Sequence, residues 1–223
     1  MKSYVVFIVS LMMVFGSCNT KQNMVGTWVD SESNAWIFNS DGKLSYVNGS
    51  ADDIREYQYV VTGTKLSVQV EGTSQIYDIS ISDNGKIVIL TGGSNLGSWR
   101  IAGPGYSKNQ LTKISPSNIT EKRWVDGSIT PTISCIAYSF LALNGKTYYI
   151  WTNDSYDGDG SKSLDIEFNV VADNNGGYGD DCWDYPFEFT ASSNSRVIIM
   201  VKAIDEGDTG SFAIAYSTTP TRP

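Results

Sequence analysis

The sequence comprises 223 residues, of which 24 are acidic and 16 are basic, so its formal net charge at neutral pH is −8. This excess of negative charge repels phosphate backbones and argues against a nucleic-acid partner. The sequence contains no histidine, which excludes the usual Ser–His–Asp and Cys–His catalytic arrangements and His-rich zinc sites. Chemistry based on a pair of carboxylates is not excluded.

The first 18 residues have the features of a secretion signal. Lys2 precedes an apolar run over residues 4–15, which is shorter than the roughly 20 residues that span a bilayer. Small residues then lead into Cys18, and this ending resembles a bacterial lipobox, in which cleavage leaves a lipid-modified N-terminal cysteine. We therefore expect a signal peptide over residues 1–17, a lipidated tether over residues 18–23 and membrane attachment through Cys18.

The alternative is an ordinary secreted protein that is cleaved nearby without lipidation. Acyl chains contribute roughly 0.8 kcal/mol per buried methylene, so more than one chain gives durable anchoring. The residues after Cys18 lack an acidic run that would resemble a surface-export signal. We therefore expect a cell-envelope protein of the outer membrane that faces the periplasm.

Eight short strands are predicted between residues 24 and 102. Apolar and polar residues alternate along them, and the turns between them are rich in Asn, Asp and Gly. Eight hairpin-linked strands can close into a barrel, which leaves no unpaired edge. The predicted ranges are 24–30, 34–39, 43–47, 54–62, 65–71, 73–81, 86–91 and 97–101.

The motif Gly26-Thr27-Trp28 in the first predicted strand resembles the Gly-x-Trp element of lipocalin-like domains. Arg100, in the last predicted strand, stands where that family places an arginine over the tryptophan. The resemblance implies a small up-and-down barrel closed by a Trp28–Arg100 cation–π contact worth about 0.5–2 kcal/mol. Both residues would then be structural.

Aromatic residues of the same domain are candidates for lining a cavity that binds a small apolar ligand. The alternative is that they form the barrel core, which is the more common role of aromatic residues on strands. The candidates are Trp36, Phe38, Tyr46, Tyr57 and Tyr59.

Residues 103–110 contain Gly, Pro and polar side chains and are predicted to link the barrel to a second domain over residues 111–218, which a tail over residues 219–223 follows. About seven strands are predicted in the second domain, which indicates an antiparallel β-sandwich with jelly-roll character. The whole chain is therefore expected to be all-β. The predicted strands lie near residue 124 and over 133–143, 147–152, 164–172, 186–191, 196–204 and 210–217.

Several segments of the second domain resemble bacterial pre-peptidase C-terminal domains and related carbohydrate-binding sandwiches. The matching segments are Trp124–Ile129, Tyr138–Phe140, Gly145–Ile150, Val197–Val201 and Gly210–Tyr216. Such domains are accessory modules on many secreted proteins. The resemblance therefore implies a binding module and not an enzyme.

An acidic segment over residues 153–160 is a candidate calcium site. Calcium takes six to eight oxygen ligands, and glycines let carboxylates and carbonyls converge. The alternative is a solvated loop in which Asp, Asn and Gly serve turn geometry. The candidate ligands are Asp154, Asp157, Asp159 and Asp165.

A second acidic segment, over residues 173–185, carries Tyr178, Trp183 and Tyr185. Aromatic rings beside amides and carboxylates suit sugars, because the rings cover C–H faces and the polar groups bind hydroxyls. The same segment could instead be a long loop pinned by a Cys135–Cys182 disulfide, which an oxidising envelope permits. Two buried thiols are the alternative to that disulfide.

These observations favour a non-enzymatic envelope lipoprotein that binds a glycan or an apolar small molecule. One alternative is an accessory or inhibitory subunit that docks on another envelope protein. Another is a glycoside hydrolase with a carboxylate pair, although no spacing in the sequence identifies the pair.

Overall fold

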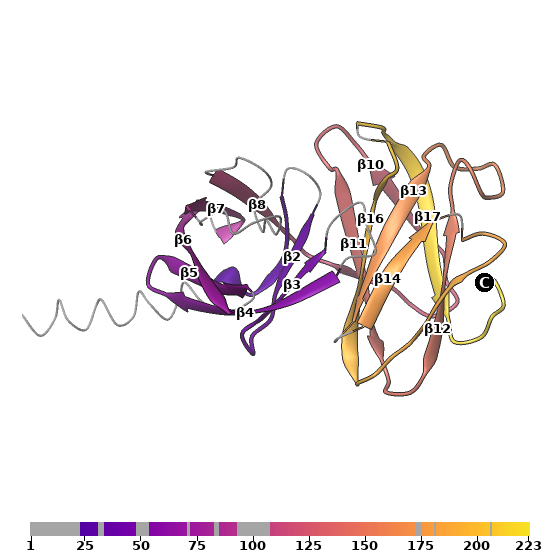
Figure 1. Cartoon of the computed structure of the whole chain (residues 1–223). Helices are drawn as coiled ribbons and strands as arrows, with labels where there is room; N and C mark the ends of the chain where they lie inside the picture. The colour runs from indigo at the N-terminus through magenta and orange to yellow at the C-terminus, as the bar shows by residue number, and fades with distance from the viewer. Residues whose placement is uncertain are drawn as a thin grey trace, which may run out of the picture. The chain divides into compact units, whose positions relative to one another are not determined.

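A computed structural model of the chain describes residues 23–30, 34–47, 54–70, 72–82, 85–92, 108–172, 175–180, 182–205 and 207–223. The predicted signal peptide, Cys18 and Arg100 lie outside these ranges. The described part is almost entirely β-structure (Figure 1) and forms two compact units, one mainly from the residues up to Lys113 and the other mainly from Ile114 onwards. Among the described residues, no helix is long and apolar enough to cross a membrane.

The first unit is a closed barrel in which eight strands follow one another in chain order. This arrangement confirms the all-β class and the eight-stranded up-and-down barrel. The strands are β1 (Gly26–Val29), β2 (Ala35–Phe38), β3 (Lys43–Val47), β4 (Ile54–Thr62), β5 (Lys65–Val70), β6 (Thr73–Ser82), β7 (Ile87–Gly92) and β8 (Lys108–Ile114).

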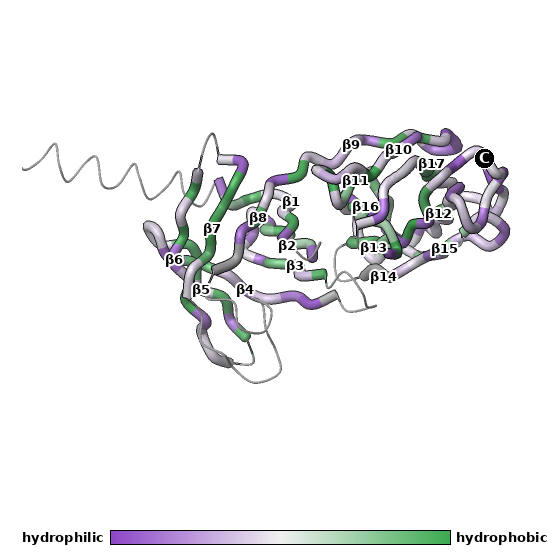
Figure 2. The backbone as a smooth tube through the Cα atoms, turned by 90° about the horizontal axis from the view of Figure 1, so that it is seen from above, coloured by the Kyte–Doolittle hydropathy of each residue, from purple (hydrophilic) through white to green (hydrophobic). Residues whose placement is uncertain are grey.

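Strand alternation fills the inside of the barrel with apolar side chains. In β5, Leu66 and Val68 are buried, whereas Lys65 is exposed. Strand β7 is hydrophobic over much of its length (Figure 2), and its Leu90 pairs with Ile79 of β6. Period-two patterning of this kind places one face of each strand in the core.

The last barrel strand differs from the prediction. Residues 103–110 were expected to be a linker and the second domain was expected to begin at residue 111, but β8 occupies Lys108–Ile114. Its Leu111 is buried and pairs with Val88 of β7, among otherwise polar neighbours. Because β8 has so little apolar alternation, its local sequence does not predict a strand. Its strand conformation is set by pairing with β7.

The second unit is a β-sandwich, as predicted. A four-stranded sheet has the order β10-β17-β12-β15, and a five-stranded sheet has the order β14-β13-β16-β11-β9. The four-stranded sheet contains β10 (Val125–Ile129), β12 (Thr147–Asn153), β15 (Phe187–Thr190) and β17 (Gly210–Ser217). The five-stranded sheet contains β9 (Ser117–Asn118), β11 (Cys135–Ala142), β13 (Ile166–Ala172), β14 (Asn175–Asp180) and β16 (Ser195–Ala203).

Aromatic side chains from both sheets form the sandwich core. Phe140 of β11 stacks on Tyr216 of β17 with ring centroids 4.1 Å apart, and Phe168 of β13 lies edge-on to Phe187 of β15 at 5.9 Å. Such pairs contribute about 0.5–1.5 kcal/mol beyond their buried area. They hold the two sheets together and so fix the loops that connect them.

Candidate functional site

Two loops of the sandwich, residues 154–165 and 182–186, are joined by hydrogen bonds. The backbone N–H of Trp183 donates to Asp157 Oδ2 at 3.0 Å. Beside it, Cys182 N–H donates to Thr152 Oγ1 at 2.9 Å, and Thr152 N–H donates to the Cys182 carbonyl at 3.2 Å. Strand β12 therefore anchors the second loop, and Asp157 holds the first loop against it.

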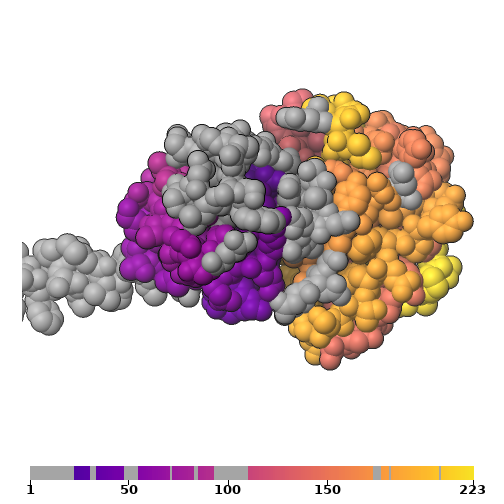
Figure 3. All heavy atoms as spheres, viewed as in Figure 1, coloured from indigo at the N-terminus to yellow at the C-terminus, as the bar shows by residue number. Residues whose placement is uncertain are grey.

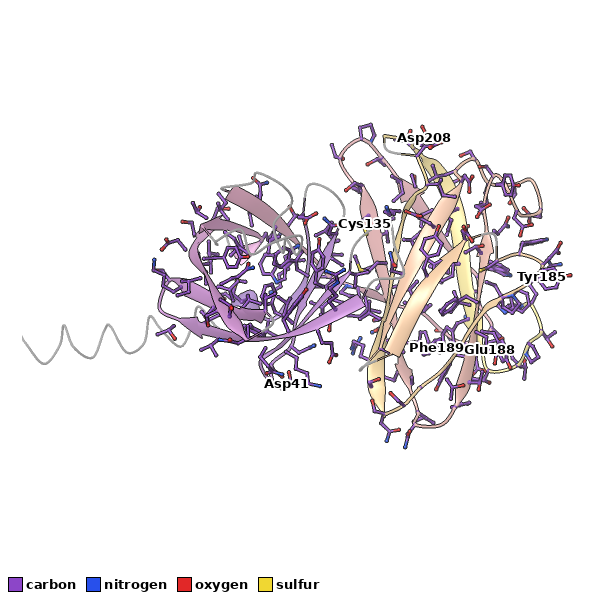
Figure 4. The ribbon with its side chains drawn as sticks, in the orientation of Figure 1. Asp41, Cys135, Tyr185, Glu188, Phe189 and Asp208 are labelled. Atoms are coloured by element: carbon purple, nitrogen blue, oxygen red, sulfur yellow. The ribbon has the colours of Figure 1, made fainter. Side chains whose placement is uncertain are left out.

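Each of these loops carries a strongly exposed tyrosine. Tyr156 is 75% exposed and Tyr185 is 84% exposed, and Tyr185 projects away from the strands of the sandwich (Figure 4). Exposed carboxylates, Asp159 and Asp184, lie three residues after Tyr156 and directly before Tyr185. We call these two loops, with their aromatic and acidic side chains, the loop site.

Trp183, the third aromatic residue of the loop site, is packed on a ring of another segment. Its indole lies 5.7 Å from that of Trp124, at a tilt of 35°. The guanidinium of Arg222 lies over the Trp183 ring at 3.8 Å from its centroid. Of the predicted aromatic residues Trp183 and Tyr185, the second is therefore open to solvent and the first is partly covered.

The structure separates Tyr178 from Trp183 and Tyr185. Tyr178 lies on β14, and its hydroxyl donates to Glu167 Oε2 at 2.8 Å. Glu167 also pairs with Lys202 at 2.5 Å. Burial, followed by the hydrogen bond and negative charge of Glu167, raises the pKa of Tyr178 above its ordinary value. Tyr178 thus belongs to a polar network of the five-stranded sheet.

The predicted calcium ligands are used in turns of the first loop. Asp154 Oδ1 accepts N–H groups from Tyr156 at 3.1 Å and Asp157 at 2.8 Å. Asp159 Oδ1 accepts the N–H of Ser161 at 2.9 Å. The described residues contain no group of three His, Cys, Asp or Glu side chains placed to hold a metal ion. Calcium binding therefore stays a prediction.

Asp165, the fourth predicted ligand, is associated with other carboxylates. Burial, together with the negative charges of Asp205 and Asp180, raises its pKa above the ordinary value of 3.8. Acid–base catalysis by a carboxyl group uses a raised pKa of this kind.

The disulfide prediction is wrong: Cys135 and Cys182 are both described and are not bonded to each other. Cys182 lies in the sandwich core, and its Sγ donates to the Asp180 carbonyl at 2.8 Å. Cys135 alternates with Ile136, which packs against the core, so its side chain points to the other face of the sheet. Burial raises the pKa of Cys135 to about 12, which keeps it a thiol.

The aromatic candidates of the barrel pack on one another. Trp36, Phe38 and Tyr59 are buried, and Tyr46 and Tyr57 are partly buried against the same core. Trp36 lies edge-on to Tyr46 at 5.3 Å, and Phe38 lies edge-on to Tyr59 at 5.0 Å. Trp36 Nε1 donates to Asp30 Oδ2 at 3.0 Å. These contacts are those of a core, as the alternative interpretation held.

Three residues were not singled out from the sequence: Tyr156, which is strongly exposed, Arg222, which lies over Trp183, and Lys113, which lies over Trp28. Tyr156 was passed over because it stands among acidic turn residues. Arg222 was missed because it contacts Trp183, which lies 39 positions earlier. Lys113 was missed because its strand, β8, was not recognised.

The sequence matches no protein-family model and no curated protein. Among solved structures, the chain is similar to the pre-peptidase C-terminal domain of collagenase from Bacillus anthracis. That likeness has a TM-score of 0.38 and 16% identity, and it covers 47% of this chain and 96% of that one.

The chain is also similar to PliG from Aeromonas hydrophila, described as a periplasmic lysozyme inhibitor of g-type lysozyme. Here the TM-score is 0.35 with 18% identity, over 47% of this chain and 98% of that one. Likenesses of this size assign neither a family nor a function to the chain.

Proposed function

We propose that the protein is a non-enzymatic, lipid-anchored binding protein of the cell envelope, and that the loop site binds a glycan. The observation that supports this most directly is the pair Tyr156 and Tyr185, which are strongly exposed on two loops held together by Asp157. Single exposed apolar residues are common, but an exposed aromatic residue on each of two joined loops suits a binding surface. Asp159 and Asp184 are exposed carboxylates on the same two loops, and we propose that they accept sugar hydroxyl groups.

A small apolar ligand in the barrel has less support. Trp36, Phe38 and Tyr59, which were candidates for lining a cavity, fill the barrel core and contact one another or their neighbours. A ligand there would have to displace buried side chains.

A second candidate function is docking on another envelope protein. Val60 of β4 and Ile76 of β6 are 60% and 55% exposed. Both pair with Ser67 of β5, so they lie in one row across the outside of the barrel. An exposed apolar row of this kind fits a protein contact, and stoichiometric co-purification of a partner that a Val60→Ser and Ile76→Ser double variant loses would support it.

The proposed glycan binding is tested by applying the purified protein to a glycan array and to a panel of lipids. We expect retention of at least one glycan and of no lipid. Binding of lipid alone would favour the apolar-ligand alternative. A folded protein that retains nothing on either panel would exclude binding in the form proposed.

The proposed lipidation is tested separately by labelling cells with a fatty acid. The wild-type protein should be labelled, whereas Cys18→Ala should remain an unlabelled precursor or a soluble protein. Equal labelling of both forms would contradict lipidation at Cys18.

A further inference from the structure

Trp124 and Trp183 pack on each other at the four-stranded sheet of the sandwich, and Trp151 lies on β12 of the same sheet. Trp151 of β12 alternates with Ile150, a core residue, and so points away from the core. The residue opposite Trp151 on β17 is Ala215, which has a small side chain and is buried. Trp124 directly precedes β10, which pairs with the other side of β17. The Trp183 ring packs on the Trp124 ring at a tilt.

The C-terminal segment, residues 219–223, lies against Trp124 and Trp183. Trp124 Nε1 donates to the Pro223 carbonyl at 3.0 Å. Besides covering the Trp183 ring, Arg222 donates from Nη1 to the Trp183 carbonyl at 3.2 Å and lies 3.8 Å from an oxygen of Asp184. Figure 3 shows the last residues, in yellow, on the surface of the second unit.

The contacts that bind residues 219–223 to the tryptophans are weak. Residues 219–222 are exposed, and the side chains of the Arg222–Asp184 pair are 39% and 72% exposed. Exposed ion pairs and exposed cation–π contacts both contribute little stability. A ligand that offers the Trp183 ring an equivalent contact can therefore displace Arg222.

Trp151 supplies a second and independent indication of a ligand. It is only 4% exposed, and its Nε1–H has no hydrogen-bond partner among the described residues. Buried indole N–H groups usually find an acceptor. A sugar hydroxyl or ring oxygen beside Trp151 would provide one.

We propose that Trp124, Trp151 and Trp183 form a carbohydrate subsite that Arg222 and Pro223 close, and that a sugar ring stacks on Trp183 in place of the Arg222 guanidinium. This inference rests on the proposed glycan binding, and it adds that the C-terminal segment regulates that binding. The chain's own segment competes with the ligand, so removing Arg222 strengthens binding, although it removes no group that the glycan would contact.

The test measures the affinity of purified protein for chitotriose, cellotriose, maltotriose and mannotriose. Arg222→Ala should bind one of them about two- to fivefold more tightly than wild type, because it no longer has to break the cation–π contact. Arg222→Gln, which keeps most of the side chain and loses its charge, should show a gain of the same sign. Arg123→Ala, which removes an equal charge next to Trp124, is the control and should not change the affinity.

Fluorine NMR on 5-fluorotryptophan protein locates the change. The signals of Trp183 and Trp151, assigned through Trp→Phe variants, should move on sugar addition, and the Trp183 signal should already move in Arg222→Ala without sugar. If wild type binds a sugar and both Arg222 variants bind it no more tightly, the proposal that Arg222 competes with the sugar is wrong, whereas the proposal of glycan binding stands. If no form binds any of the four sugars although the Trp183 signal moves in Arg222→Ala, glycan binding itself fails and the inference fails with it.

Discussion

Lys113 lies over the indole ring of Trp28, with its Nζ 5.1 Å from the ring centroid. Trp28 belongs to β1 and is fully buried, and its Nε1 donates to the Met24 carbonyl at 2.7 Å. Lys113 belongs to β8, the last strand, and its Nζ also donates to the Asn23 carbonyl at 3.4 Å. A cation of the last strand therefore lies over the tryptophan of the first strand. Arg100 lies outside the described residues, so its expected contact with Trp28 stays a prediction.

The contact between Lys113 and Trp28 predicts that Lys113→Ala lowers the free energy of unfolding by about 0.5–2 kcal/mol, the range of a cation–π interaction. Lys113→Arg should retain most of it. Lys65→Ala is a matched control, because Lys65 forms an exposed ion pair with Asp78, and such pairs contribute about 0–1 kcal/mol. Urea denaturation measures all three variants. Equal losses for Lys113→Ala and Lys113→Arg would show that the charge over Trp28 contributes nothing.

Gly179 predicts a packing effect in β14. A Cβ atom at this position would overlap the ring of Phe168, which is fully buried. Gly179→Ala should therefore cost about 1–3 kcal/mol of stability, as overpacking does. Adding Phe168→Leu should recover part of that loss, whereas Phe168→Leu combined with Gly145→Ala should be additive, because nothing lies near a Cβ at Gly145. Additivity in both pairs would contradict the overlap.

Asp157 predicts an effect on the link between the two loops. Asp157→Ala removes the acceptor for the Trp183 N–H, and the loss of one such hydrogen bond should cost about 1 kcal/mol. The melting temperature should fall equally in chelator and in millimolar calcium, and Asp208→Ala, an exposed charge elsewhere, should leave it unchanged. A rise in wild-type melting temperature with calcium that Asp157→Ala abolishes would instead support the calcium site.

Asp165 predicts a pH dependence of stability. Its pKa is raised in the folded protein, so the folded state binds more protons than the unfolded state between the ordinary pKa of 3.8 and the raised value. Stability contributed through this group therefore increases as the pH falls through that window and is lowest at neutral pH. Asp165→Asn should raise the melting temperature at pH 7 and bring no gain below pH 3.8. A lower melting temperature of the variant at pH 7 would contradict the assignment.

Local pattern explains why most strands were predictable, whereas β8, β9 and β14 were not. Strand β5 carries alternating apolar residues that a period of two detects, and β7 is recognisable as a short continuous apolar run. Strand β14 was expected to be loop because Gly177 and Gly179 lack side chains, and their places are taken by the rings of Phe187 and Phe168. Its strand state is set by pairing with β13, which no window of the sequence contains.

The candidate site, like the strands, could be predicted from the sequence only where a local pattern marks it. Trp183 and Tyr185 were found because aromatic residues stood out in an acidic segment. The link between Asp157 and Trp183, and the cover that Arg222 provides, depend on contacts between positions 26 and 39 residues apart. Such contacts follow from how the sandwich brings its loops together, so they could not be derived from local sequence.

The central claim is that the loop site binds a glycan through its exposed aromatic rings. Titration calorimetry with the best glycan from the array, on wild type, Tyr185→Ala and Leu141→Ala, tests it most directly. Leu141 is 72% exposed on β11 and lies outside the loop site, so it controls for loss of any exposed apolar side chain. We predict an affinity about fivefold lower for Tyr185→Ala, since an aromatic contact contributes about 1 kcal/mol, and no change for Leu141→Ala. Equal affinities for wild type and Tyr185→Ala would contradict the account.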